Sequence, residues 1–217
     1  MLVKLAATRW LSWGRAVERV LDQFEPLKSM FQEAAVECAS AQSLTAMYNT
    51  TNKLYLTFLK PILLELNKPN ACFQSTSADI TEIYRDLRYF VFSTARRILK
   101  PEAVPVVNQE DGVLRTTELQ ALRTALSSGQ SYLSLDRMQF GAAFAEYARS
   151  LALPAPVFDT IRKKCADFLV CLCRELVERL PLCINTVERL RFFAPHRVMA
   201  RRARPTFQQL PLDLART

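Results

Sequence analysis

The chain has 217 residues, which is enough for one domain with a sizeable hydrophobic core. Half of the residues are hydrophobic, only four are glycine and 23% are charged, a composition that favours a packed globular helical protein over a disordered one. The formal net charge of +8 favours acidic partners such as nucleic acid or an anionic surface.

The sequence also argues against several classes of protein. The most apolar run, residues 54–66, contains Lys60 and Glu65 and is too short for a membrane span of about 20 residues. Lys4 and Arg9 interrupt the apolar residues near the N-terminus, so we expect no secretory signal. Glycine-rich phosphate loops and GxSxG and HExxH motifs are absent, so we expect no cofactor and no small-molecule substrate.

The cysteines form no CxxC pair and predict neither a redox motif nor a metal site. We expect reduced, buried thiols in an intracellular protein, with a disulfide framework as the alternative. A zinc site is not expected, because His196 is the only histidine. The cysteines are Cys38, Cys72, Cys165, Cys171, Cys173 and Cys183.

The first predicted element is an amphipathic helix. After Trp13, apolar residues recur every three or four positions, which is the period of one buried helical face. Ser12 is its predicted N-cap, because the hydroxyl can accept a hydrogen bond from a free amide of the first turn. Pro26 disfavours helical geometry at Glu25, so we predict a kink or short break there.

Two further helices are predicted in the first half of the chain. Polar residues 40–51 predict a connection, although their apolar members are able to extend a helix. Residues 54–66 then predict a helix that is apolar on nearly every face and is kinked or begun by Pro61. The next helix is predicted to begin at residues 75–77 and to end before Pro101.

A proline-containing segment, residues 101–115, predicts a loop and a candidate subdomain boundary. Shorter helices are predicted at 117–126 and 134–151. The strongest helix prediction follows Pro154, because the helical period then persists for six turns. A short helix at about 185–193 completes the series.

No segment has the alternating pattern of a convincing strand. We therefore predict an all-α fold, an irregular bundle of six or seven helices. Residues 1–193 form the predicted helical domain, and residues 194–217 form a basic, proline-containing C-terminal extension.

A series of short motifs runs along most of the chain. They are TRWLS at residues 8–12, VERVL at 17–21, LK at 27–28, NKLYLTFL at 52–59, PIL at 61–63, NACFQS at 70–75 and LRFFAP at 190–195. In this order they resemble hAT-superfamily transposases, from the segment after the second catalytic aspartate through the helical insertion domain. The resemblance is nearest to vertebrate proteins domesticated from such elements, which often carry BED-type zinc fingers.

The resemblance implies a particular catalytic chemistry and places it elsewhere. Such transposases are similar to other ribonuclease H-like recombinases, in which two aspartates and a glutamate on a mixed sheet hold two divalent metals. In the family, both aspartates precede the Arg-Trp motif and the glutamate follows the helical insertion. We therefore expect no catalytic residue, no metal ligand and no enzymatic activity in this chain, and a catalytic sheet that is absent or vestigial.

The first candidate site is the pair Arg9 and Trp10, which matches the family's Arg-Trp motif. In the family this tryptophan lies beside the active site, where it can stack on DNA, and a neighbouring guanidinium can hold a phosphate. Ala6 stands where the family motif has cysteine or serine. The alternative is that Trp10 and Trp13 cover the bundle while Arg9 lies at the surface.

The second candidate site is a cluster of arginines near the C-terminus. These residues predict either salt-dependent phosphate contacts or a nuclear localisation patch, and a solvated tail is the alternative. The cluster comprises Arg189, Arg191, Arg197, Arg201, Arg202 and Arg204.

The leading functional hypothesis is a catalytically inactive, hAT transposase-derived nuclear protein that binds DNA ends or hairpins, protein partners or both. A second hypothesis is a helical scaffold that binds proteins, or a second copy of itself, without DNA. A third is a fragment of a larger active transposase that carries out metal-dependent strand transfer. The cytoplasm is the alternative to a nuclear location, and no membrane partner is expected.

Overall fold

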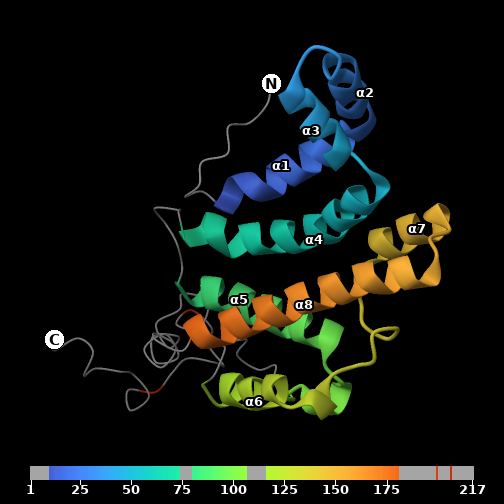
Figure 1. Cartoon of the computed structure of the whole chain (residues 1–217). Helices are drawn as coiled ribbons and strands as arrows, with labels where there is room; N and C mark the ends of the chain where they lie inside the picture. Colours follow the sequence, from blue (N-terminus) through green and yellow to red (C-terminus); the bar gives the residue numbers. More distant parts are fainter. Residues whose placement is uncertain (1–9, 74–79, 107–115, 181–198, 200–205, 207–217) are drawn as a thin grey trace. The chain divides into compact units, whose positions relative to one another are not determined.

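The structure of the protein, a computed structural model, describes residues 10–73, 80–106 and 116–180 together with Met199 and Thr206 (Figure 1). Within these ranges it contains eight α-helices, two short 3₁₀-helices and no strand. An isolated bridge between Leu99 and Tyr132 is the one pairing of extended backbone found in them. The all-α fold class is therefore confirmed, with more helices than the six or seven expected.

Contacts between residues divide the chain into two compact units. The first unit comprises Met1–Asn70 and Leu135–Phe168, and the second comprises Ala71–Ser134 and Leu169–Thr217. The chain therefore passes from one unit to the other three times, and the third passage lies inside a helix.

The first unit contains α1 (Trp10–Asp22), α2 (Phe24–Ala34), α3 (Ala39–Met47), most of α4 (Thr50–Phe73), α7 (Ala142–Leu151) and the first half of α8 (Ala155–Arg179).

Phe58 of α4 is 2% exposed and lies at the centre of an aromatic cluster. Its ring is edge-on to those of Phe140, Phe144 and Phe168, with centroids 6.2, 6.2 and 5.8 Å away. Aromatic pairs prefer this geometry, so the cluster stabilises the unit beyond its buried area.

The N-terminal region differs from the sequence prediction in three ways. Helix α1 begins at Trp10, so Ser12 lies inside it and is not its N-cap. The break between α1 and α2 falls at Gln23, whereas Pro26 lies in the first turn of α2. Amides of the first turn have no partner within a helix, so a proline there costs little. The predicted connection is largely helix α3, which ends at Met47.

Two other helix boundaries also correct the prediction. Helix α4 runs through Pro61, which neither begins nor ends it. Helix α7 begins at Ala142 and not at residue 134, because Gly141 precedes it with φ of +104°. That backbone conformation is favourable for glycine and interrupts a continuous helix.

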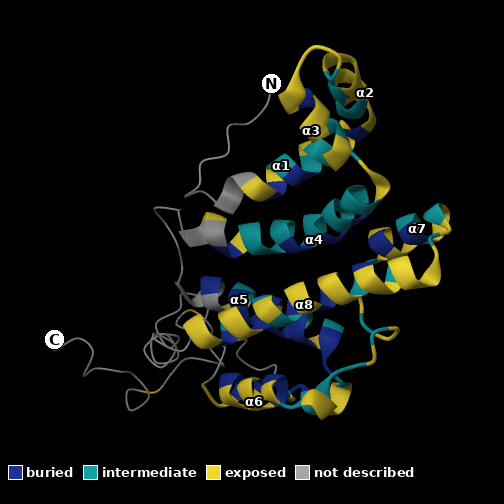
Figure 2. Cartoon of the chain, viewed as in Figure 1, coloured by how far each residue is buried: buried dark blue, intermediate teal, exposed yellow. Residues whose placement is uncertain are grey.

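The second unit contains α5 (Ile80–Ile98), η1 (Pro101–Ala103), α6 (Thr116–Ser127), η2 (Gly129–Ser131) and the rest of α8. Much of its buried surface lies on α5 and α6 (Figure 2). The backbone amide of Lys100 donates to the carbonyl of Ser131 at 2.9 Å, and that of Leu133 donates to Ile98 at 2.8 Å. These bonds fix the end of α5 against the segment that follows α6.

The helices predicted at residues 117–126 and after Pro154 are confirmed as α6 and α8. The helix predicted near residues 185–193 lies outside the described residues, as does nearly all of the C-terminal extension. No helix in the described ranges is long and apolar enough to cross a bilayer.

We expect Phe58→Ala to lower the free energy of unfolding by about 3–5 kcal/mol, because it leaves a cavity at the centre of the aromatic cluster. Phe168→Ala is the matched control, because Phe168 is 38% exposed and the site can refill with solvent. Urea unfolding of both variants measures the difference. Equal losses would contradict a cluster centred on Phe58.

Candidate nucleic-acid interface

The site residues predicted from the sequence fall almost entirely outside the described part of the chain. Trp10 is the first residue of α1, but its side chain is not described. Its neighbour Trp13 is 45% exposed. The remaining candidates, Arg9, Arg189, Arg191, Arg197, Arg201, Arg202 and Arg204, lie outside the described residues, so their roles stay predictions.

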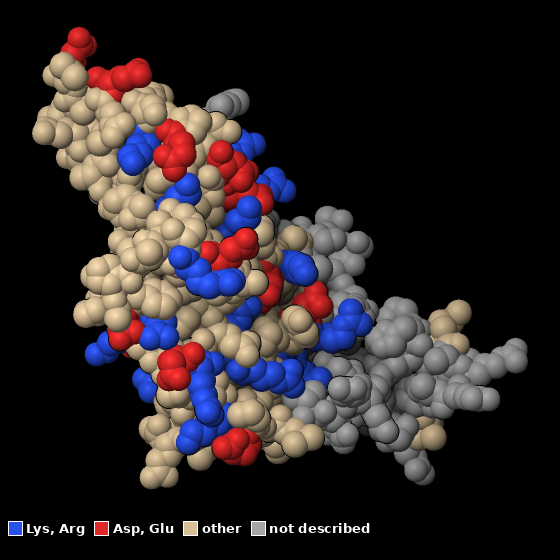
Figure 3. All heavy atoms as spheres, turned by 90° about the vertical axis from the view of Figure 1, so that its right-hand side faces the viewer, with Lys and Arg blue, Asp and Glu red and all other residues tan. Residues whose placement is uncertain are grey.

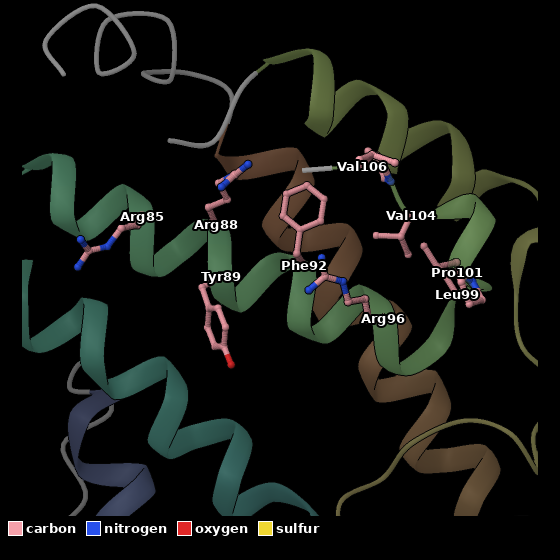
Figure 4. Close-up of a pocket in the computed structure, with 10 residues that line it drawn as sticks. Arg85, Arg88, Tyr89, Phe92, Arg96, Leu99, Pro101, Val104 and Val106 are labelled. Carbon is pink, nitrogen blue, oxygen red and sulfur yellow. The ribbon is translucent and has the colours of Figure 1, made fainter. Parts of the chain in front are cut away.

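Within the second unit, one face of α5 forms a groove with the segment that follows it. Arg85, Tyr89, Phe92 and Arg96 are three or four residues apart, so they lie on the same side of the helix. The groove has a volume of about 730 Å³. Figure 4 shows the α5 side chains and those of the segment up to Val106. It is lined by Arg85, Arg88, Tyr89, Phe92, Arg96, Leu99, Pro101, Val104, Pro105 and Val106.

The floor of the groove is apolar and well buried. Phe92, Leu99 and Val104 are 3%, 1% and 8% exposed. Lys100 precedes η1 in extended conformation, and Pro101 begins that turn, where a proline's fixed φ and missing amide are tolerated. The segment that begins at Pro101 therefore passes beside α5, and the polar and aromatic side chains of α5 face the groove between them.

Arg88 is held by a buried ion pair. Its Nη2 and Nε donate to Glu118 Oε1 and Oε2 at 3.0 and 3.2 Å, and the two side chains are 8% and 10% exposed. The guanidinium also lies 5.7 Å from the centre of the Phe92 ring. A two-pronged Arg–carboxylate contact fixes geometry as well as charge, so it joins α5 to α6 beneath the groove.

The remaining charge of the groove is positive. Arg85 and Arg96 are exposed, and none of the described residues that line the groove is acidic. By contrast, acidic and basic side chains are mixed over the face shown in Figure 3. Glu118 neutralises Arg88, and the lining presents the exposed guanidinium groups of Arg85 and Arg96 beside an aromatic ring. Guanidinium groups bind phosphate and carboxylate in this way.

Tyr89 is the one aromatic side chain of the groove that faces solvent. It is 69% exposed, whereas Arg88 and Phe90 on either side are 6% and 2% exposed. Its ring extends from α5 in Figure 4. A large exposed ring between two arginines is typical of a surface that binds a flat, anionic ligand.

The cysteines differ in their environments. Cys38 is exposed at the start of α3, where the backbone amides of Ala41 and Ser40 stabilise the thiolate and lower the pKa. Burial raises the pKa of Cys165 and of Cys173 to about 12. Among the described residues, no group of three potential metal ligands lies close enough to hold an ion.

The groove combines residues that the sequence analysis did not connect. That analysis named neither Arg96 nor Tyr89 as a candidate site residue. The spacing of Arg85, Tyr89 and Arg96 along one helical face was a readable signal. The position of the wall at residues 101–106 was not, because the wall follows Lys100, whose backbone amide donates to Ser131 after α6.

Comparison of the chain with protein-family models, with curated proteins and with solved structures finds no match.

We expect Glu118→Ala to lower the free energy of unfolding by about 3–5 kcal/mol, because Arg88 would keep a buried charge without its partner. The double variant Arg88→Met with Glu118→Leu should stay near the stability of the unchanged chain, since it removes both charges together. Urea unfolding measures both. A double variant as unstable as Glu118→Ala would contradict this account.

We expect Cys38 to react with a thiol reagent at about pH 8 faster than an unperturbed cysteine, because its lowered pKa gives more thiolate. Cys165 and Cys173 should react only after unfolding, since they are buried and stay protonated until the pH approaches about 12. Labelling over a pH series with peptide mass spectrometry measures each site. Labelling of Cys173 in the native protein would contradict the structure.

Proposed function

We propose that the chain is a transposon-derived, non-enzymatic protein of the nucleus whose helical domain binds nucleic acid. The observation that supports the proposal is the α5 groove, where Arg96 places positive charge beside the exposed ring of Tyr89 and none of the described lining residues is acidic. Phosphate contacts supply most of the affinity in such interfaces, and aromatic rings add stacking.

The resemblance to hAT-superfamily transposases supports the same class of ligand, because the helical insertion domain of that family helps to hold DNA ends. On this proposal Arg9 and Trp10 contribute stacking and a phosphate contact. The arginines from Arg189 to Arg204 add sequence-independent phosphate contacts and direct the chain to the nucleus.

A second candidate function, a protein-interaction module, is favoured by the first unit. Helices α2 and α3 and their connection expose large apolar side chains, which are typical of surfaces that recruit a partner. These side chains are Met30, Val36, Leu44 and Met47, with 47%, 87%, 38% and 59% exposure.

We expect the purified chain to bind labelled nucleic acid, with an affinity that falls steeply between about 50 and 200 mM salt. Binding releases counterions from the nucleic acid, and this release becomes less favourable as the salt concentration rises. Replacing Arg96 with glutamine should weaken binding and lower the slope of log affinity against log salt by close to the value for one phosphate contact. Fluorescence anisotropy over a salt series measures both effects.

The matched control is Arg123→Gln, because Arg123 is an exposed arginine of α6 in the same unit and does not line the groove. This variant should bind as the unchanged chain does. Equal losses in the groove and control variants would indicate nonspecific electrostatics. Absence of binding at low salt would refute the proposal and leave the protein-interaction module.

A further inference from the structure

We propose that the α5 groove binds unpaired nucleotides, with a base stacked on Tyr89 and a neighbouring phosphate on Arg96. This inference rests on the proposed function and narrows the ligand to nucleic acid that contains unpaired bases. The shared ligand chemistry is a base with an open π-face on a phosphodiester chain, in DNA or RNA.

The position of Tyr89 is the first reason. The residues before and after it, Arg88 and Phe90, are buried, yet Tyr89 is 69% exposed and contributes little to the core. No hydrogen bond of its hydroxyl is recorded among the described residues. Its exposed ring is therefore available to a ligand, and a rigid aromatic ring loses little entropy when it stacks.

The second reason is that the arginines of the groove differ in burial and pairing. Arg88 is saturated by Glu118, so it positions α5 and carries no free charge to a ligand. Arg96 is exposed on the same face as Tyr89, about two helical turns away from it. A phosphate that follows a stacked base along the helix would meet this guanidinium.

The chemistry of the walls is the third reason. Apart from its arginines and Tyr89, the lining consists of Phe92, Leu99, Val104, Val106 and two prolines. Proline has no amide to donate, and these side chains offer no fixed donors or acceptors to base edges. The groove therefore recognises stacking and charge, and we expect little discrimination among base sequences.

These properties favour single strands over duplexes. Inside a duplex both faces of each base are covered by neighbouring bases, and freeing one face costs a few kcal/mol. An unpaired base already has a free face. The groove volume of about 730 Å³ lies within the range of pockets that enclose a molecule of nucleotide size.

The test is fluorescence anisotropy of the full chain with labelled oligo-dT, oligo-U and a mixed-sequence duplex of equal length at one salt concentration. We expect both single strands to bind more tightly than the duplex. Tyr89→Ala should weaken single-strand binding by about 5- to 150-fold, the range measured for loss of one base–aromatic stack. Tyr89→Phe should retain the affinity, because it keeps the ring.

Arg96→Gln should lower the slope of log affinity against log salt by about 0.7 on single strands, and Arg123→Gln should leave it unchanged. Circular dichroism and thermal unfolding should be the same for all four variants, since each replaces an exposed side chain. This separates a binding defect from a folding defect.

The outcomes distinguish this inference from the function on which it rests. Equal or tighter binding of the duplex, or single-strand binding unaffected by Tyr89→Ala, would overturn the inference and leave nucleic-acid binding intact. Failure to bind any of the three ligands would overturn the proposed function itself. Binding of oligo-U alone or oligo-dT alone, lost with Tyr89→Ala, would support the inference and identify the sugar that the groove accepts.

Discussion

The second unit depends on the buried pair between Arg88 and Glu118. A charge removed from water must be matched closely, and the two-pronged contact at 3.0 and 3.2 Å does this between helices α5 and α6. Because the guanidinium also lies over Phe92, the same contact fixes the floor of the groove. The pair sets the rotation of α5 about its axis, and that rotation decides which side chains reach solvent.

Seen in this way, three arginines of one helix have different physical roles. Arg88 is neutralised inside the unit, whereas Arg85 and Arg96 lie at the surface on either side of an exposed ring. A count of basic residues would treat them alike. Burial and pairing separate them, and they show why the overall charge of +8 says less about a ligand than the position of two side chains.

Local pattern was sufficient for much of the fold. The period that continues after Pro154 identified α8, because a long amphipathic helix repeats its signal over many turns. Boundaries were less accessible: Gly141 delays α7 through its backbone conformation, and Pro26 is absorbed into a first turn. Local pattern did not reveal the groove. Glu118 is 30 residues from Arg88, and the hydrogen bonds that hold the end of α5 join Ile98 and Lys100 to residues after α6.

Helix α8 presents a buried residue at every fourth position, from Ile161 through Cys165, Leu169 and Cys173 to Val177. The first two belong to one unit and the last three to the other, so one continuous helix supplies buried residues to both units. No single cut of the polypeptide separates the two units, because each consists of two segments that alternate along the chain. Genetic exchange at one breakpoint within this chain would therefore not transfer one unit without part of the other, and the two are expected to be gained and lost together.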